Sequence, residues 1–162
     1  MNIDYFHASK FGNGAQVAAE FKRRMGARGV AVDVHHISDV DAADLPLADL
    51  YVFSSPGRMG RPIRAMRRFL KDIALPAGTR YAVLTTELAT KTDKKTGEVP
   101  ACSKWQRVIP LMVETLDGKG LVRVATDRVH VRDVKGPLED GWQAVVDEFA
   151  ARLADTRPSA LR

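Results

Sequence analysis

The chain has 162 residues, a hydrophobic fraction of 45% and a formal net charge of +5. This length suits one domain, the apolar fraction excludes wholesale disorder, and no apolar run approaches the roughly 18–20 residues that cross a bilayer. The single cysteine, Cys102, excludes a disulfide framework, and the first residues lack the pattern of a signal peptide. We therefore expect a cytoplasmic protein whose basic surface favours an acidic partner.

The first part of the chain alternates predicted strands and helices. Residues 3–7 form an apolar first strand. A helix is predicted from Gly14 to about Arg28, with Val17, Phe21 and Met25 on one face. Residues 30–36 alternate apolar and polar side chains, a pattern typical of a strand at a sheet edge.

The remaining elements follow the same alternation. Residues 50–53 and 81–84 are continuous apolar runs, which favour central strands covered on both faces. Between them Pro62 is predicted to open a helix at its first position. After a polar loop over residues 87–101, we expect a helix over residues 105–116 that Pro110 kinks or restarts. A strand over residues 121–133, interrupted near Thr126, and a helix carrying Trp142, Val145, Val146, Phe149 and Leu153 complete the series.

A strand–helix unit repeated about five times predicts an α/β fold, a three-layer doubly wound five-stranded parallel sheet. Residues 1–155 are predicted to form this single domain, with residues 156–162 as a frayed tail. Ligands of such sheets bind at the carboxyl ends of the strands, so the loops after the first, third and fourth strands are the candidate site.

The loop after the first strand, residues 8–14, is small and rich in glycine. Backbone N–H groups at the start of the following helix can hold a phosphate, although a plain Gly-Asn-Gly turn is the alternative interpretation. Val17 stands where the dinucleotide fingerprint needs a third small residue, and no Walker lysine followed by Ser or Thr is present.

The run from Ser9 to Gly14, directly after the first strand, resembles the phosphate loop of the flavodoxin family. Residues 54–61 resemble that family's second flavin loop, and residues 85–88 occupy the place of the third. The resemblance implies a strand order of 2-1-3-4-5, bound flavin mononucleotide (FMN) and electron transfer without catalytic side chains. The FMN contacts that it implies are Ser9, Lys10, Phe11, Gly12, Asn13, Gly14, Ser54, Ser55, Pro56, Gly57, Arg58, Met59, Gly60, Thr85, Thr86 and Glu87.

The sequence departs from the family pattern in three ways. Gly14 replaces the Thr or Ser that usually ends the phosphate loop. The second and third flavin loops lack the aromatic residues that stack on the ring in many members, which leaves Met59, Phe11 or Trp105 to cover it. The chain is also basic, whereas flavodoxins are typically acidic.

Two alternatives to an electron carrier stay open. The pattern Ser-x-x-Arg-x-Gly from Ser55 to Gly60 resembles the flavodoxin-like menaquinone-dependent protoporphyrinogen oxidases, which favours a dedicated flavoenzyme. A basic binding module with a vestigial flavin site is the second alternative. The sequence does not fit a response regulator, because Ser54 and Ser55 stand where its aspartate would end the third strand, and it lacks a hydrolase Gly-x-Ser-x-Gly elbow.

Basic residues repeat after the third strand, and we expect them to dock an acidic redox protein near the flavin. Because no nucleic-acid-binding motif is visible, we do not expect a nucleic-acid partner. No histidine has a carboxylate or cysteine at metal-ligand spacing, so we expect no metal. The predicted docking stripe consists of Arg61, Arg64, Arg68 and Lys71, with Lys91, Lys94, Lys95 and Lys104 at its rim.

Overall fold

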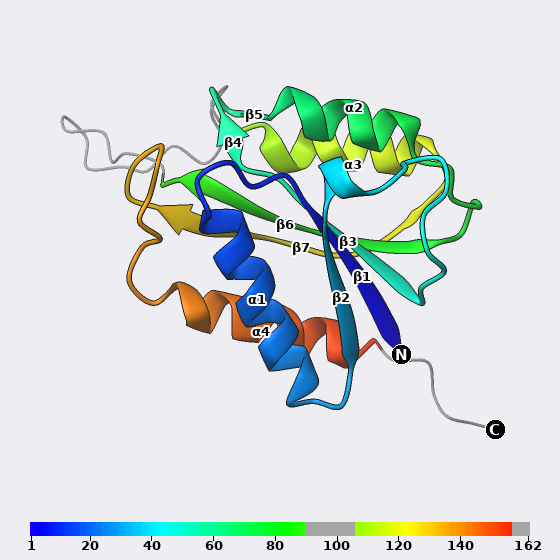
Figure 1. Cartoon of the computed structure of the whole chain (residues 1–162), viewed down its shortest axis with the longest axis horizontal. Helices are drawn as coiled ribbons and strands as arrows, with labels where there is room; N and C mark the ends of the chain where they lie inside the picture. Colours follow the sequence, from blue (N-terminus) through cyan, green and yellow to red (C-terminus); the bar gives the residue numbers. More distant parts are fainter. Residues whose placement is uncertain (90–105, 157–162) are drawn as a thin grey trace.

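Five parallel strands form the central sheet of the computed structural model, which describes residues 1–89 and 106–156 (Figure 1). The predicted three-layer α/β fold and the strand order 2-1-3-4-5 are confirmed. The strands labelled β4 and β5 form a separate hairpin, so β6 and β7 are the fourth and fifth strands of the central sheet. In spatial order the sheet strands are β2 (Ala31–His36), β1 (Asn2–His7), β3 (Leu50–Ser54), β6 (Arg80–Leu88) and β7 (Val122–Val131).

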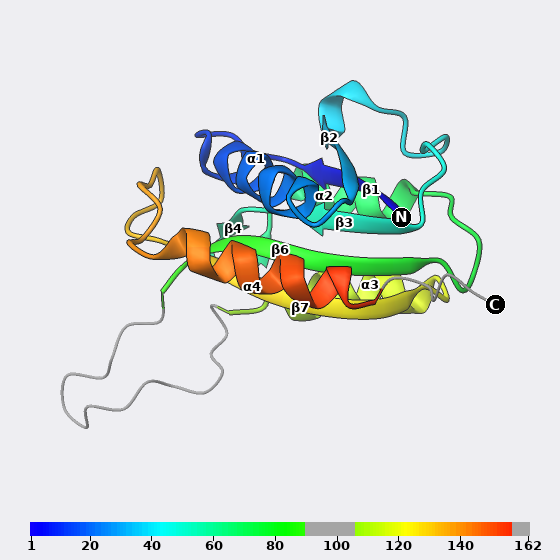
Figure 2. The same ribbon diagram turned by 90° about the horizontal axis from the view of Figure 1, so that it is seen from below.

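In the described ranges, two α-helices cover each face of the sheet. Helices α1 (Asn13–Gly26) and α4 (Trp142–Ala154) lie side by side on one face, and α2 (Arg64–Asp72) and α3 (Val108–Gly118) cover the other (Figures 1 and 2). Alternate side chains of each strand enter opposite cores, as strand geometry requires. On β3, for example, Val52 packs toward α1 and α4 while Phe53 packs toward α2 and α3.

The burial of the strands matches their predicted positions. Every residue of β3 is buried, whereas β2 and β7 lie at the edges and keep polar side chains partly exposed. Strand β7 continues through Thr126, where the sequence indicated an interruption. Its irregularity lies at Val124 instead, because Tyr81 pairs with Arg123 while the next residue, Ala82, pairs with Ala125.

The segment after β3 corrects the predicted start of the second helix. Pro62 belongs to the short strand β5 (Arg61–Pro62), which pairs with β4 (Gly57–Arg58), and α2 begins only at Arg64. Met59 and Gly60 form the hairpin turn with φ values of +53° and +76°, as in a type I′ turn. The residue types do not predict this hairpin, because a type I′ turn needs a positive φ at its first central residue and methionine rarely adopts one.

Pro110 lies in the first turn of α3, where its missing N–H has no intrahelical partner to lose, so the helix begins just before it and no kink is needed. Strand β6 runs to Leu88, two residues into the predicted polar loop, because its end pairs with β7. Trp142 is half-buried against the core rather than fully inside it. Trp105, the remainder of that loop and the end of the tail lie outside the described residues. Within residues 1–89 and 106–156, no helix is long and apolar enough to span a bilayer.

Candidate functional site

The loops that follow β1, β3 and β7 meet the end of β6 at one edge of the sheet, where the strands have their carboxyl ends (Figure 1). A cavity of about 320 Å³ lies between them. This is where the sheet topology places a ligand site, and the volume lies in the range of small-molecule pockets.

The loop after β1 is held in shape by glycine and serine. Gly12 precedes α1 with φ +91°, a conformation that L side chains rarely adopt, and its N–H donates to Ser9 Oγ at 3.1 Å. No side chain caps the start of α1, and no acidic residue stands in its first turn. The first N–H groups of the helix, together with its dipole, therefore suit an anion.

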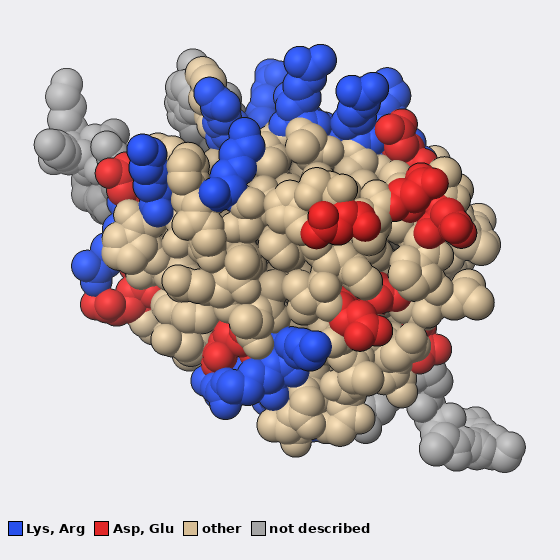
Figure 3. Space-filling view, viewed as in Figure 1, with Lys and Arg blue, Asp and Glu red and all other residues tan. Residues whose placement is uncertain are grey.

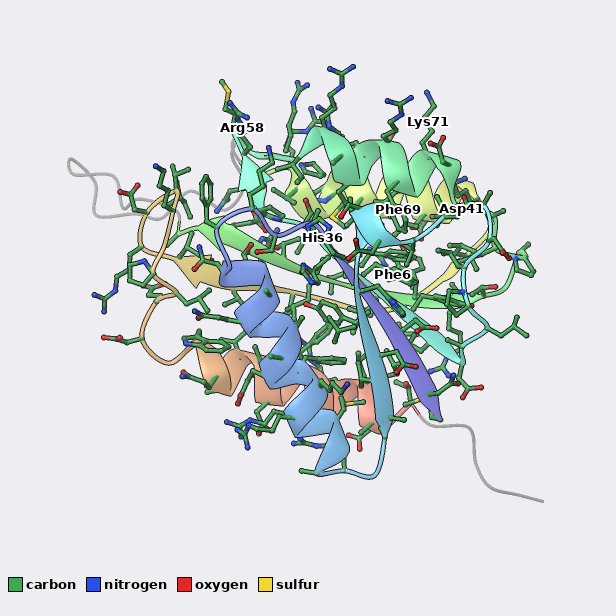
Figure 4. The ribbon with its side chains drawn as sticks, viewed as in Figure 1. Phe6, His36, Asp41, Arg58, Phe69 and Lys71 are labelled. Carbon is green, nitrogen blue, oxygen red and sulfur yellow. The ribbon has the colours of Figure 1, made fainter. Side chains whose placement is uncertain are left out.

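Two histidines hydrogen-bond to the backbone of Ser9 and fix its position in the loop. The Ser9 N–H donates to His7 Nδ1 at 3.3 Å, and His36 Nε2 donates to the Ser9 carbonyl at 3.1 Å. His36 Nδ1 accepts from Ser38 N at 3.1 Å, so the ring proton that reaches the Ser9 carbonyl is carried by Nε2. Burial, with a smaller contribution from His36, lowers the pKa of His7, which favours the neutral form that can accept from Ser9. Figure 4 shows His36 at the end of β2 beside this loop.

Gly14 and Gly57 allow close approaches at the two sides of the cavity. A Cβ on Gly14 would lie 3.1 Å from Ser9 Cβ, so glycine lets the start of α1 pack against the loop. A Cβ on Gly57 would lie 3.0 Å from Val108 Cγ2 and 3.3 Å from Glu87 Cγ. Glycine at these two positions therefore lets the start of α1 and the strand β4 pack closely against their neighbours around the cavity.

Ser55 supports the hairpin from its base. Its hydroxyl donates to the Pro56 carbonyl at 2.9 Å and accepts from Ile63 N at 3.3 Å. Its carbonyl accepts from Thr86 N at 3.1 Å, which ties the end of β3 to β6. Both Ser55 and its neighbour Ser54 are buried, and neither lines the cavity.

Successive residues at the end of β6 take different roles, since side chains alternate along a strand. Thr86 lines the cavity, whereas the buried residues Thr85 and Glu87 do not. The Thr85 hydroxyl donates to the Glu87 carboxylate, and Arg128 Nε lies 3.2 Å from Glu87 Oε2. The one carboxylate expected in these loops is therefore paired with a cation.

The structure thus separates the predicted contact residues into two groups. The residues that line the cavity are Ser9, Lys10, Phe11, Asn13, Gly14, Pro56, Gly57, Arg58, Met59 and Thr86. Those that frame it without lining it are Gly12, Ser54, Ser55, Gly60, Thr85 and Glu87. Three lining residues were not predicted, namely Leu88, Val131 and Val134.

The rim of the cavity is unusually apolar for a solvent-exposed surface. Of the six large hydrophobic side chains that are exposed in the described ranges, Phe11, Met59, Leu88 and Val134 line this cavity, each at least half exposed. Such a cluster marks a binding site more often than a plain surface. Val134 comes from the loop after β7, whose only sequence signal is an isolated apolar residue between charged neighbours.

The loop after β7 contacts the loop after β1 directly. Lys135 Nζ lies 5.7 Å from the centre of the Phe11 ring, and a Cβ on Gly136 would lie 2.6 Å from Asn13 Oδ1. Across residues 1–89 and 106–156, no group of His, Cys, Asp and Glu residues could hold a metal ion. Cys102 and the rim lysines Lys91, Lys94, Lys95 and Lys104 lie outside those ranges.

By sequence, no protein-family model and no curated protein matches the chain. By structure, it resembles oxidised flavodoxin 2 from Bacillus cereus, at a TM-score of 0.76, 19% identity, and coverage of 97% of this chain and all (100%) of that one. Oxidised flavodoxin 1 from Bacillus cereus gives a TM-score of 0.72 at 18% identity, over 98% of this chain and 100% of the other. Rubredoxin oxygen:oxidoreductase from Desulfovibrio gigas gives 0.69 at 15% identity, over 95% of this chain but 35% of its own. The chain therefore has a flavodoxin-like fold.

Proposed function

We propose that the protein binds FMN in the cavity between these loops and acts as an electron carrier. The observation that carries the proposal is the composition of the cavity wall, where an uncapped helix start and Lys10 lie beside exposed apolar side chains. FMN has the same two parts, an anionic phosphate and a flat apolar ring. The flavodoxins that share this fold support the proposal.

Each part of the wall would hold one part of the cofactor. Ser9, Asn13 and the N–H groups at the start of α1 would bind the phosphate, with Lys10 adding positive charge. Met59, Leu88, Phe11 and Val134 would shield the ring in place of stacked aromatic side chains. When bound, FMN supplies the electron transfer, and the protein supplies binding and electrostatics.

A titration with two flavins tests this assignment. We expect FMN to bind in a one-to-one ratio and riboflavin, which lacks the phosphate, at least a hundredfold more weakly. Quenching of flavin fluorescence measures both affinities. Equal affinities would contradict the phosphate assignment, and no binding of either flavin would contradict the proposed cofactor.

A pair of glycine substitutions separates an effect on FMN binding by the loop after β1 from an effect on protein stability. Gly12 and Gly29 both have a positive φ, +91° and +74°, and a Cβ on either would meet nothing within 4 Å. Gly12→Val and Gly29→Val should each lose roughly 1–2 kcal/mol of stability or more from backbone strain. Only Gly12→Val should lose FMN affinity, by at least tenfold, because Gly29 lies at the other end of α1.

The partner that we propose is an acidic redox protein. The docking stripe of Arg61, Arg64, Arg68 and Lys71 is exposed and lies along the hairpin and α2, next to the cavity. Figure 3 shows basic side chains gathered along the top of the molecule, the edge at which Figure 1 places the hairpin and α2. In Figure 4, Arg58 and Lys71 both project outward at this edge, away from the sheet.

A further inference from the structure

A second cavity, of about 640 Å³, lies beside the first, between the hairpin β4–β5, the loop after β1 and the starts of α2 and α3. We refer to it as the basic cleft. Its apolar lining comes from Met59, Pro62, Ile63 and Ala65. Its charged lining comes from Lys10, Arg58, Arg61, Arg64, Arg67 and Arg107.

In the part of the chain that the structure describes, no acidic side chain neutralises the charge of the cleft. No carboxylate of the ranges 1–89 and 106–156 lines it, and none of its six cations forms an ion pair with another residue of these ranges. The start of α2 adds to the positive potential, because it has no side-chain cap and no acidic residue in its first turn. Six cations around one concave surface attract anions far more strongly than the same cations dispersed would.

The walls of the cleft are held in place by the backbone. The Arg107 N–H donates to the Gly60 carbonyl at 2.7 Å, which links the start of α3 to the hairpin turn. Ile63, whose N–H bonds to Ser55 Oγ, is buried and fixes the start of α2. The guanidinium groups therefore project from a fixed frame rather than from a free loop.

We propose that the basic cleft binds a small organic polyanion, a molecule with two or more carboxylate or phosphate groups on an apolar body. The guanidinium groups would bind the anionic groups in pairs of hydrogen bonds, and the apolar lining would contact the body. The cleft shares Lys10, Arg58 and Met59 with the proposed FMN cavity, so the two ligands would lie side by side. Only this proximity rests on the proposed function, because binding to the cleft needs no FMN.

The cleft and the docking stripe share Arg61 and Arg64 but differ in their other basic residues. Arg67 and Arg107 line the cleft but do not belong to the stripe, whereas Arg68 and Lys71 belong to the stripe but do not line the cleft. Arg67 and Arg68 are consecutive, exposed residues of the same helix. They therefore give a matched pair for separating a small-molecule site from a diffuse basic surface.

Calorimetric titration of the protein, with and without FMN, tests the proposal. The probes are benzene-1,3,5-tricarboxylate and hydroquinone bisphosphate, which share an aromatic body and distinguish carboxylate from phosphate ligands, and benzoate as a monoanion. We expect at least one polyanion to bind in a one-to-one ratio and at least thirtyfold more tightly than benzoate. Absence of polyanion binding, or equal affinity for benzoate, would overturn the proposal.

Two double variants with the same loss of charge locate the binding. Arg67→Gln with Arg107→Gln should weaken polyanion binding at least tenfold, and Arg68→Gln with Lys71→Gln should weaken it less than twofold. Equal weakening in both would assign the binding to general surface charge and overturn the cleft. Single Arg67→Gln and Arg68→Gln variants repeat the comparison if a double variant fails to fold. Polyanion binding without FMN binding would overturn only the proposed function, and the reverse result only the cleft.

Discussion

Arginine residues form two contrasting surfaces on opposite faces of the sheet. On the side of α1 and α4, Glu20 accepts from Arg23 Nη2 and from Arg24 Nε, each at 2.7 Å. Arg28 Nη1 lies 3.0 Å from Asp147 Oδ1, which links α1 to α4. On the side of α2, the cations of the stripe and the cleft have no ion pair within residues 1–89 and 106–156.

The difference teaches that the basic character of the chain has two separate physical consequences. Paired arginines contribute to the stability of the helices that carry them, although exposed pairs contribute little each. Clustered arginines without carboxylates repel one another and create a positive potential that reaches into solvent. The first surface should therefore respond to mutation in stability, and the second in binding.

Charge reversal on each surface gives the largest expected effect. Arg64→Glu with Arg68→Glu should slow electron transfer to an acidic plant-type ferredoxin at least tenfold at low salt, with little change in stability. Arg23→Glu with Arg24→Glu, which has the same net charge, should lower stability and leave that rate within about twofold. Stopped-flow mixing with FMN-loaded protein and thermal unfolding measure the two responses.

The salt dependence of the wild-type rate is the internal control for this comparison. Attraction between a basic surface and an acidic protein weakens as salt rises, so the rate should fall with ionic strength. The rate with basic cytochrome c should not fall in this way. If both pairs of reversals slow the ferredoxin reaction equally, overall charge rather than the docking stripe controls it.

Much of the fold could be predicted because its signals are local. The alternation of Val30, Val32 and Val34 placed β2 at an edge, and the unbroken apolar run of residues 50–53 placed β3 at the centre. The hairpin β4–β5 was not predicted because its two-residue turn is Met59-Gly60 and lacks the Asn-Gly or Asp-Gly pair typical of such turns. Pro62 could open a helix or end a short edge strand, and only pairing with Gly57 decides between them.

The candidate site was predictable where a short segment directly follows a predicted strand, as it does at the ends of β1, β3 and β6. The order of residues 9–14 after a strand identified the first loop, and most of those residues line the cavity. Val134 and Arg107 come from segments far along the chain, and only tertiary packing brings them to the hairpin. A serine hydroxyl can bind a ligand or hold a loop in place, so the sequence could not tell which of these Ser55 does. In the structure its oxygen accepts from Ile63 N.

Charge beside the flavin gives a smaller expected effect. Arg58 lines both cavities and is exposed, and Glu87 nearby is already paired with Arg128. Reduction adds negative charge to the flavin, so Arg58→Glu should lower the midpoint potential of bound FMN by roughly 20–60 mV after screening by water and salt. Spectroelectrochemical titration measures the shift, with Arg23→Glu as a distant control that should move the potential far less. An unchanged or raised potential in Arg58→Glu would show that this side chain does not act on the flavin.

The smallest expected effect lies on the paired surface, at Glu20. Hydrogen bonds from Arg23, with a further contribution from Arg24, lower the pKa of Glu20 from 4.5 to about 2. Because the folded pKa lies below the unfolded value, the pairs stabilise the protein fully above about pH 4.5, and this contribution is lost as the pH falls toward 2. At pH 7, Glu20→Gln should lower the free energy of unfolding by roughly 0.5–1 kcal/mol, or about 1–4 °C in melting temperature. The difference between wild type and variant should shrink as the pH falls below 4.5, while FMN affinity stays unchanged. A difference that is constant with pH would mean that Glu20 acts through packing, and a loss of FMN affinity would mean that the two surfaces are not independent.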